Sequence, residues 1–318
     1  MTTSANRTVL CLLGPTASGK TDLAIALARR QPTDLVSVDS AMVYRGMDIG
    51  TAKPDARTLA EFPHALIDIR EPHEGYSAAA FVADACRCIE AAFAAARMPI
   101  LVGGTMLYFK ALLEGLADLP ATSPELRQKL RRQSQRNGLA VMYRRLQAVD
   151  PVAAERIDSN NSQRLLRALE VYENSGIPIS KFWAEQRAQG LAERLDCQPY
   201  CIALVPPRPL IHQRIERRFN EMLDAGLLRE VDALRRRKEL HEDSPSMRAV
   251  GYRQAWQHLE GLTSEAEMIE RALAATRQLA KRQFTWLRGW PDLYTIDPVR
   301  QDAAAAALQY LDTVAIVP

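Results

Sequence analysis

The sequence predicts an α/β fold in which helices flank a parallel sheet and an all-helical domain is inserted into the chain. Two observations lead to this prediction. Short apolar runs alternate with helical patterns over most of the 318 residues, and one long stretch, residues 118–199, shows helical patterns but no convincing strand. Alternation of strands with helices is typical of a parallel sheet, because a crossover between parallel strands is usually a helix.

Six apolar runs bounded by turn residues are the predicted strands. They are Val9–Leu13, Leu35–Val38, Ala65–Ile69, Ile100–Val102, Cys201–Val205 and Leu293–Ile296. The main predicted helices around them are Asp22–Arg30, Ala78–Arg97, Arg214–Glu239 and Ser264–Trp290, and those of the insertion are Pro124–Asn137, Ala140–Val149, Ser162–Ser175 and Lys181–Arg187. We therefore expect a core of residues 1–117 and 200–318, interrupted by a helical domain of residues 118–199.

A phosphate-binding loop follows the first predicted strand. Gly14–Thr21 reads Gly-Pro-Thr-Ala-Ser-Gly-Lys-Thr, which matches G-x-x-x-x-G-K-[ST] and precedes a helical pattern. In such a loop the glycines let backbone N–H groups surround a phosphate, Lys20 adds positive charge, and Thr21 can ligate Mg²⁺. The pattern predicts a P-loop NTPase-like core that binds a pyrophosphate group; the alternative is an ordinary glycine turn before a helix.

A carboxylate follows the second predicted strand. Asp39 stands where doubly wound sheets bind ligands, in the crevice at the carboxyl ends of the strands. Its possible roles are Mg²⁺ organisation and general-base catalysis, and the sequence alone does not choose between them. A helix cap or a strand-end turn is the non-catalytic alternative.

The fourth predicted strand is followed by Gly103-Gly104-Thr105. Many P-loop nucleotidases place a metal-organising aspartate here, and this chain has none. Two glycines allow a ligand to approach the backbone closely, and Thr105 offers a hydroxyl group. A tight turn without a ligand is the alternative.

The positive charge is concentrated in the middle and later parts of the chain. The formal net charge is +3, but residues 121–200 contain 13 basic against 9 acidic residues, and residues 201–290 contain 16 against 12. This distribution fits a polyanionic partner, although a solvated charged surface would look the same.

No run approaches the roughly 18 apolar residues of a membrane span, and residues 1–8 lack a signal peptide's apolar stretch. We expect a cytoplasmic protein that does not bind membranes.

Further motifs recur in a fixed order along residues 9–297. They are the loop Gly14–Thr21, Asp39-Ser40 with the block Asp48–Pro54, Tyr76-Ser77 with Phe81, Pro99–Tyr108, Gln163–Leu165 with Arg167–Glu170, Gly251–Gln254, and Thr276–Gln283 with Thr285-Trp286. In this ordered set the chain closely resembles the tRNA dimethylallyltransferase family, also called tRNA isopentenyltransferases. The loop alone would be unspecific, but the ordered set is highly specific.

The resemblance implies a transferase that holds the diphosphate of dimethylallyl diphosphate in its P-loop. The dimethylallyl group would pass to the exocyclic amine of the adenosine immediately 3′ of the anticodon, tRNA position 37, in tRNAs that read codons beginning with U. The implied catalytic residues are Asp39, as the base, and Thr16 and Arg218, which help to bind the diphosphate. The implied diphosphate-binding residues are Gly14, Pro15, Thr16, Ala17, Ser18, Gly19, Lys20 and Thr21, with Thr21 on the cofactor Mg²⁺.

The resemblance also implies contacts with the tRNA anticodon stem-loop, whose target base must be flipped out to react. Thr105 would position the target nucleotide. The implied tRNA-binding residues are Asp39, Ser40, Ala41, Met42, Thr105, Arg127, Gln163, Arg164, Leu165, Leu166, Arg167, Arg248, Ala249, Val250, Gly251, Tyr252, Arg253, Lys281, Arg282, Gln283, Phe284, Thr285, Trp286, Leu287 and Arg288. Taken alone, Arg164 and Arg167 would be solvated helix residues. The family suggests a monomer.

Three other functions share part of this pattern. A P-loop small-molecule kinase needs the same loop, but also an ATP base pocket and usually an arginine-bearing lid, where this chain has a basic helical insertion. A non-catalytic RNA-binding module would not need the intact Lys20-Thr21 pair. Transfer to free adenylate, as in cytokinin synthesis, uses similar front-end motifs, but the insertion and the Gly251–Gln254 block favour tRNA.

Overall fold

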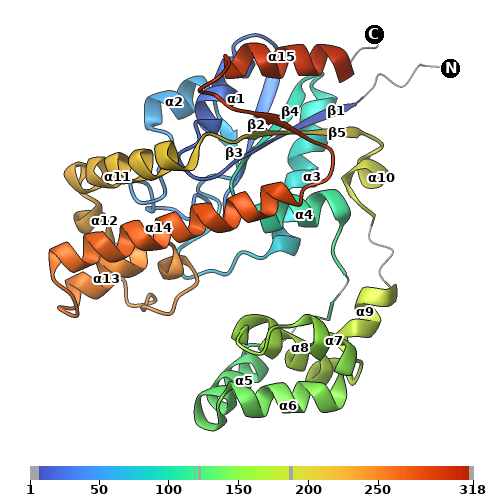
Figure 1. Ribbon diagram of the computed structural model, residues 1–318, viewed down its shortest axis with the longest axis vertical. Helices are drawn as coiled ribbons and strands as arrows, with labels where there is room; N and C mark the ends of the chain where they lie inside the picture. The colour runs from blue at the N-terminus through green and yellow to red at the C-terminus, as the bar shows by residue number, and fades with distance from the viewer. Residues whose placement is uncertain (1–6, 118, 121–122, 186–188, 315–318) are drawn as a thin grey trace. The chain divides into compact units, whose positions relative to one another are not determined.

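The structure is a computed structural model that describes residues 7–117, 119–120, 123–185 and 189–314. The chain divides into two compact units (Figure 1), of which the first is Met1–Leu113 with Gly190–Pro318 and the second is Glu114–Gln189. The second unit ends earlier than the predicted insertion of residues 118–199, because helix α10 (Leu191–Leu195) and strand β5 (Gln198–Leu204) belong to the first. Residue 118, where the insertion was predicted to begin, lies outside the described residues.

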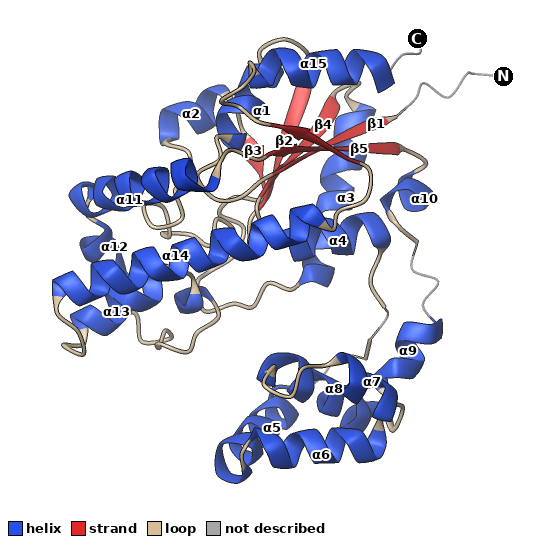
Figure 2. Ribbon diagram, in the orientation of Figure 1, coloured by secondary structure: helices blue, strands red, loops and turns tan. Residues whose placement is uncertain are grey.

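The first unit is built on a six-stranded parallel sheet with the order β3-β2-β4-β1-β5-β6 (Figure 2). The strands are β1 (Thr8–Leu13), β2 (Thr33–Val38), β3 (His64–Ala65), β4 (Met98–Gly103), β5 (Gln198–Leu204) and β6 (Leu293–Ile296). Every neighbouring pair is parallel. The predicted α/β class with a parallel sheet is confirmed, and the carboxyl ends of all six strands meet at one edge.

Strand β1 lies in the middle of the sheet and is buried on both faces. Leu10 and Leu12 belong to a core with α1 (Lys20–Ala28) and α15 (Ala303–Val314). Val9, Cys11 and Leu13 point the other way, into a core with α3 (Ala78–Ala94) and α4 (Met106–Glu114). Successive side chains on a strand face opposite sides, so an uninterrupted apolar run fits a strand covered by helices on both faces.

The predicted third strand, Ala65–Ile69, is wrong beyond its first residue. Leu66 and Asp68 have φ values of 67° and 55°, which lie far from extended backbone. The amides of Asp68 and Ile69 donate instead to the carbonyl oxygens of Met42 and Val43, at 3.2 and 2.9 Å. The segment after β3 thereby supports the loop that follows β2, a loop that also contains the short helix α2 (Ala56–Glu61).

The predicted helix Arg214–Glu239 is two helices, α11 (Arg208–Ala225) and α12 (Leu227–Arg235). Gly226 separates them with a φ of 102°, a left-handed conformation in which glycine commonly ends a helix. The 3₁₀ helix η1 (Ser246–Arg248) and helices α13 (Tyr252–Leu259) and α14 (Glu265–Arg288) follow. The predicted helix of Ser264–Trp290 is confirmed, with Ser264 and Glu267 forming a capping box at its start.

The second unit consists of α5 (Pro124–Asn137), α6 (Leu139–Val149), α7 (Pro151–Arg156), α8 (Ser162–Ser175) and α9 (Ile179–Glu185). Its described residues form helices and loops without a strand, around their own core of Leu130, Leu146, Leu165 and Leu169. The predicted end of the last helix, Arg187, lies outside the described residues. Nowhere in the described part of the chain is there a helix both long and apolar enough to cross a bilayer.

Candidate active site

The P-loop curls between β1 and α1, and Ala17 and Gly19 adopt left-handed backbone conformations in it. Ala17 has a φ of 62° and Gly19 a φ of 95°, and the amide of Ser18 closes the turn on the carbonyl oxygen of Pro15 at 3.3 Å. A side chain at Gly14 would begin only 2.8 Å from the carbonyl oxygen of Leu204. The loop therefore needs its glycines, and it brings the amino end of α1 to the carboxyl edge of the sheet, where helix N–H groups attract anions.

Lys20 provides the cation of this loop. Its Nζ donates to the carbonyl oxygen of Pro15 at 2.8 Å. Removal from water lowers the pKa of Lys20 to about 8, with Arg218 acting in the same direction and the carboxylate of Asp39 opposing it. A bound diphosphate would oppose the desolvation more strongly, because a nearby opposite charge favours the protonated amine.

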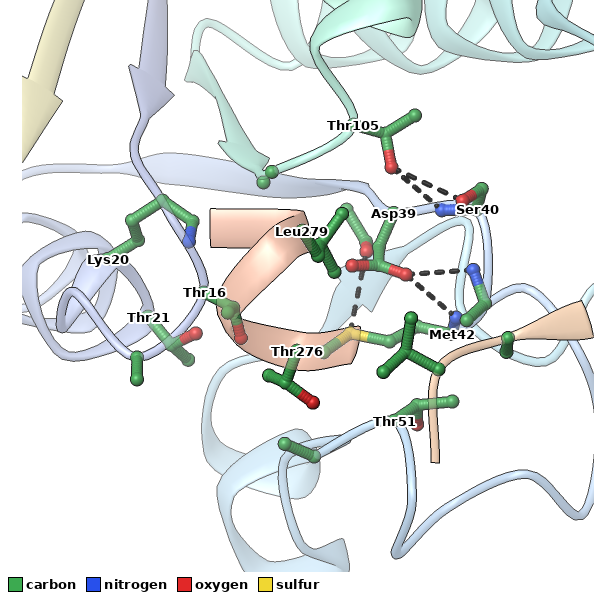
Figure 3. Close-up of a pocket in the computed structure, with 18 of the residues that line it drawn as sticks. Thr16, Lys20, Thr21, Asp39, Ser40, Met42, Thr51, Thr105, Thr276 and Leu279 are labelled. Carbon is green, nitrogen blue, oxygen red and sulfur yellow. Dashed lines mark hydrogen bonds between the residues drawn. The ribbon is translucent and has the colours of Figure 1, made fainter. Parts of the chain in front are cut away.

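One cavity of about 670 Å³ joins the P-loop to the loops after β2 and β4 (Figure 3). It lies at the carboxyl edge of the sheet, where ligands bind in this class of fold. Thr16, Lys20 and Thr21 line it beside Asp39–Met42. Of the eight residues predicted to bind a diphosphate, the structure brings Thr16, Ala17, Lys20 and Thr21 into one cavity with the predicted base, whereas Gly14, Pro15, Ser18 and Gly19 do not line it.

Asp39 closes a turn with one of its oxygens. Its Oδ1 accepts hydrogen bonds from the amides of Ala41 and Met42, at 2.8 and 3.2 Å. Among the described residues no hydrogen bond engages Oδ2, and Asp39 lines the cavity. The strand-end turn that the sequence offered as an alternative is therefore present, and it leaves one carboxylate oxygen for chemistry.

Thr105 joins the ends of β4 and β2. Its Oγ1 accepts a hydrogen bond from the amide of Ser40 at 3.1 Å (Figure 3). The two glycines before it are required by protein contacts: a Cβ at Gly103 would lie 2.1 Å from the carbonyl oxygen of Val38, and one at Gly104 would lie 2.5 Å from Nε2 of Gln283. These glycines let backbone and side chains pack closely where the sequence suggested approach by a ligand.

Gln283 is buried in α14 and connects two loops of the cavity. Its Oε1 accepts from the amide of Thr16 and its Nε2 donates to the carbonyl oxygen of Gly104, both at 2.9 Å. Sequence reasoning grouped Gln283 with tRNA-binding residues, yet its polar atoms bind protein. It therefore acts as a clamp between the P-loop and the loop after β4.

The residues present fit Mg²⁺ held partly by substrate. The Thr21 hydroxyl and the Asp39 carboxylate line one cavity, and oxygen donors are what Mg²⁺ prefers. The described residues contain no group of three or more His, Cys, Asp and Glu side chains arranged to hold a metal. Few protein ligands are expected for a Mg²⁺ ion that is bound mainly through substrate phosphates and water.

Most of the predicted tRNA-binding residues in the first unit surround this cavity. Those that line it besides Asp39–Met42 and Thr105 are Arg248–Gly251, Arg282, Gln283 and Trp286, and the predicted diphosphate ligand Arg218 lines it from α11. Lys281, Thr285 and Arg288 are exposed on α14. Tyr252, Phe284 and Leu287 are buried, so their side chains pack inside the protein.

The remaining predicted tRNA-binding residues belong to the second unit. Arg127 lies on α5, and Gln163–Arg167 form the first turns of α8, where Leu165 is buried in the core and Gln163 and Arg164 are exposed. Arg127 and Arg167 both reach the carboxylate of Glu170, at 3.7 and 3.4 Å. Two predicted RNA-binding arginines are thus oriented by one acidic side chain.

Sequence reasoning missed Glu230 and assigned no role to Lys53. Glu230, on α12, accepts hydrogen bonds from the amides of the Asp48–Gly50 segment. Lys53 belongs to the block Asp48–Pro54, which the family resemblance had already indicated. Glu230 belongs to no such motif and is 180 positions from Gly50 in the chain. Only the folded chain reveals such a pairing.

Comparisons with known proteins agree with this geometry. The family model described as IPP transferase matches residues 42–290, which is most of the chain. This chain belongs to the IPP transferase family. A tRNA isopentenylpyrophosphate transferase from Bacillus halodurans is 32% identical with a TM-score of 0.70, over 97% of this chain and 96% of that one.

Two further solved structures are similar to this IPP transferase family member. A tRNA delta(2)-isopentenylpyrophosphate transferase from Staphylococcus epidermidis is 30% identical with a TM-score of 0.67, over 96% of this chain and 97% of that one. A eukaryotic dimethylallyltransferase acting on tRNA is 25% identical with a TM-score of 0.80, over 98% of this chain and 80% of that one. The P-loop NTPase-like core is therefore one that tRNA prenyltransferases share.

Proposed function

We propose that this enzyme transfers the dimethylallyl group of dimethylallyl diphosphate to the exocyclic amine of adenosine 37 in tRNAs that read codons beginning with U. The observation that carries the proposal is the single cavity in which a P-loop faces Asp39, in a chain that belongs to the IPP transferase family. The P-loop supplies a diphosphate site and Asp39 a proton acceptor, which are the two groups that prenylation of an amine needs.

The diphosphate is the leaving group. The amides of the loop Gly14–Gly19, the ammonium of Lys20 and the guanidinium of Arg218 stabilise its negative charge as the allylic carbon–oxygen bond breaks and its electron pair goes to the diphosphate oxygen. Mg²⁺, held by Thr21 and the diphosphate, would add further neutralisation of this charge. Thr16 lines the same cavity and adds a hydroxyl beside the diphosphate.

The nucleophile is the exocyclic nitrogen of the adenine. Its lone pair forms the new bond to the allylic carbon, and the proton that it loses passes to Oδ2 of Asp39, since Oδ1 is engaged by two amides. The adenine must leave its stack to reach the cavity, and bases in single-stranded loops do so at low cost. Thr105, in the loop after β4, lines the same cavity, which supports its proposed contact with the flipped nucleotide.

The tRNA is held by basic residues in both units. In the first unit these include Arg248, Arg253, Lys281, Arg282 and Arg288, and in the second Arg127, Arg164 and Arg167. Arginine suits this task because its planar fork binds phosphates and base edges through paired hydrogen bonds. We assign RNA binding to the second unit on its charge, and action in the cytoplasm as a monomer on the chain's membership of the family.

One assay tests the reaction. Purified protein, Mg²⁺, unmodified tRNA and dimethylallyl diphosphate are incubated, and the tRNA is digested to nucleosides for mass spectrometry. Adenosine heavier by one dimethylallyl group, located at position 37, is the expected product. A parallel reaction with labelled ATP tests the kinase alternative, and movement of its phosphate onto a metabolite without prenylated adenosine would overturn the proposal.

A further inference from the structure

One wall of the reaction cavity is a loop without regular secondary structure. Gly50, Thr51 and Ala52 line the cavity from the segment that leads out of the turn at Asp39. Apolar side chains of Phe219, Met222 and Leu227 line the cavity as well. Together they give an apolar lining suited to a short hydrocarbon chain.

The loop is held by one carboxylate on a distant helix. Oε2 of Glu230 accepts the amides of Asp48 and Ile49, at 2.9 and 2.8 Å, and Oε1 accepts the amide of Gly50 at 3.2 Å. Successive backbone N–H groups of this kind form a concave site for an anion. Here the protein fills that site with its own side chain.

Packing reinforces the same contact. The hydroxyl of Tyr252 donates to Oε1 of Glu230 at 2.5 Å, and its ring leaves no room for a side chain at Gly50, where a Cβ would lie 2.5 Å from the ring. A Cβ there would also lie 2.8 Å from Leu227, the first residue of the helix that carries Glu230. The backbone at Gly50 therefore lies directly against α12 and α13.

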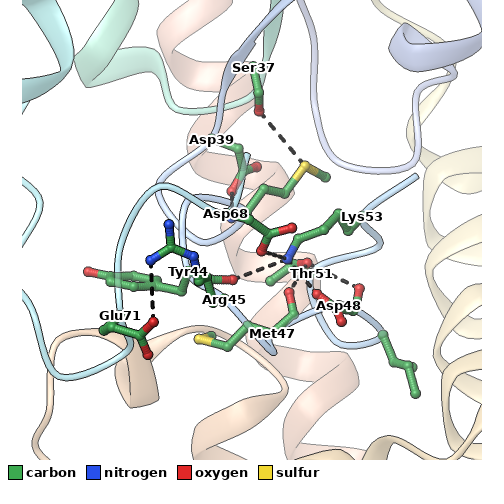
Figure 4. Close-up of polar contacts among 12 residues, drawn as sticks. Ser37, Asp39, Tyr44, Arg45, Met47, Asp48, Thr51, Lys53, Asp68 and Glu71 are labelled. Carbon is green, nitrogen blue, oxygen red and sulfur yellow. Dashed lines mark hydrogen bonds and ion pairs between the residues drawn. The ribbon is translucent and has the colours of Figure 1, made fainter. Parts of the chain in front are cut away.

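A second charged group holds the far end of the segment (Figure 4). Lys53 is only 4% exposed and donates to Asp48 at 2.5 Å, to Asp68 at 2.6 Å and to the carbonyl oxygen of Tyr44 at 3.1 Å. These contacts tie the segment to its own neighbourhood. Glu230 is the charged group that ties it to the helices α12 and α13.

We propose that Glu230 is a positioning residue, which holds Gly50–Ala52 as the wall that receives the isoprenoid part of the substrate. This inference rests on the proposed function for the identity of that substrate. Glu230 hydrogen-bonds to the backbone amides that lead into this wall. It would therefore affect the reaction only by fixing the position of the wall. Loss of the Glu230 carboxylate should weaken the binding of the dimethylallyl group and leave the binding of the diphosphate unchanged.

Glu230→Gln tests the proposal, because the amide keeps the shape but loses one of the two acceptor oxygens. We expect the affinity for dimethylallyl diphosphate, measured by calorimetry, to fall about tenfold, in line with lost hydrogen bonds to a charged group. The affinities for inorganic pyrophosphate and for tRNA should stay within about twofold of wild type. Hydrogen exchange at the amides of residues 48–50 should become faster.

Asp232→Asn is the matched control, since it makes the same chemical change on the same helix to a carboxylate paired with Arg235 and Arg236. It should change none of these values. Equal losses of pyrophosphate and dimethylallyl diphosphate affinity in Glu230→Gln would indicate a merely structural role and overturn the proposal, as would unchanged affinity and exchange. Wild-type protein that binds both ligands but forms no prenylated adenosine would instead refute the proposed reaction.

Discussion

The side chain of Gln283 accepts a hydrogen bond from the backbone amide of Thr16 over 2.9 Å, although the two residues are 267 positions apart. The same side chain donates to the carbonyl oxygen of Gly104. Helix α14 thus fixes the distance between the P-loop and the loop that carries Thr105. The proposed diphosphate site and the proposed nucleotide site are therefore connected by one buried side-chain amide.

Gln283→Ala should lower both stability and diphosphate affinity. The substitution leaves the amide of Thr16 and the carbonyl oxygen of Gly104 without their partner, and each lost hydrogen bond, being partly buried, should cost about 0.5–1.5 kcal/mol. Urea unfolding and pyrophosphate calorimetry measure the two effects. Gln278→Ala, on the exposed face of the same helix, is the control; if both variants gave the same values, Gln283 would not be a clamp.

Asp39→Asn should abolish most of the chemistry and preserve the turn. Asparagine keeps an oxygen that can accept from Ala41 and Met42, but it cannot take the proton of the attacking amine. We expect single-turnover transfer to fall about a hundredfold or more, with tRNA affinity within about tenfold of wild type. Asp39→Ala, which also loses the turn, should show the same loss of rate and a lower melting temperature. Retained transfer in Asp39→Asn would remove the residue from proton transfer.

The lowered pKa of Lys20 predicts how binding depends on pH. In the free enzyme the ammonium loses its proton near pH 8, so the affinity for a diphosphate should fall as the pH rises through 8. Lys20→Arg should move this fall to higher pH, because the guanidinium stays charged. Calorimetric titrations with pyrophosphate from pH 6.5 to 9.5 are the measurement, and an identical pH profile for both proteins would contradict the prediction.

The same shift affects stability, with a defined sign. The unfolded chain keeps the Lys20 proton up to about pH 10.5 and the folded chain only to about pH 8. Between these values the unfolded state binds more protons, so the contribution of Lys20 makes the unliganded protein more stable as the pH rises. Urea unfolding of wild type against Lys20→Met across this window isolates that contribution, and parallel curves would count against it.

Arg167→Ala should weaken tRNA binding while leaving diphosphate binding unchanged. The side chain contacts Glu170 in a unit of which no described residue lines the cavity, so the two ligands should respond independently. Filter binding of tRNA and calorimetry of pyrophosphate give the two affinities. Lys129→Ala is the control, because it removes a cation on α5 that pairs with Glu173 of α8 and that lies outside the predicted RNA-binding set. An equal loss of tRNA affinity in this variant would indicate a general charge effect.

Local signals in the sequence predicted the parts of the structure that depend on short stretches of chain. The P-loop glycines and the apolar runs of the central strands each specify their conformation through neighbouring residues. Gly226 was overlooked because helical patterns continue on both sides of it, and only its positive φ divides the helix. The prediction of the third strand was wrong beyond Ala65, because the backbone of the apolar segment that follows bonds to the loop after β2 and does not continue the sheet.

Long-range polar contacts were beyond sequence reasoning. The residues next to Glu230 in the sequence do not indicate that its carboxylate accepts hydrogen bonds from three amides near Gly50. Tyr252 belongs to a family motif, and only the structure shows that its hydroxyl donates to Glu230. Proximity in the fold creates these pairs. Several of the segments that the family resemblance indicated line one cavity, but the resemblance did not distinguish side chains that face the cavity from those that hold the segments in place.

The close approach of Gly103 to Val38 also limits how this scaffold could change its chemistry. Any residue with a β-carbon at this position would overlap the neighbouring strand, so an acidic side chain cannot be introduced there without separating the two strands. A nucleotidase-like carboxylate ligand for a metal is therefore sterically excluded at position 103. Engineering a carboxylate at this position, in order to turn the protein toward phosphate hydrolysis, would first require the centre of its sheet to be rebuilt.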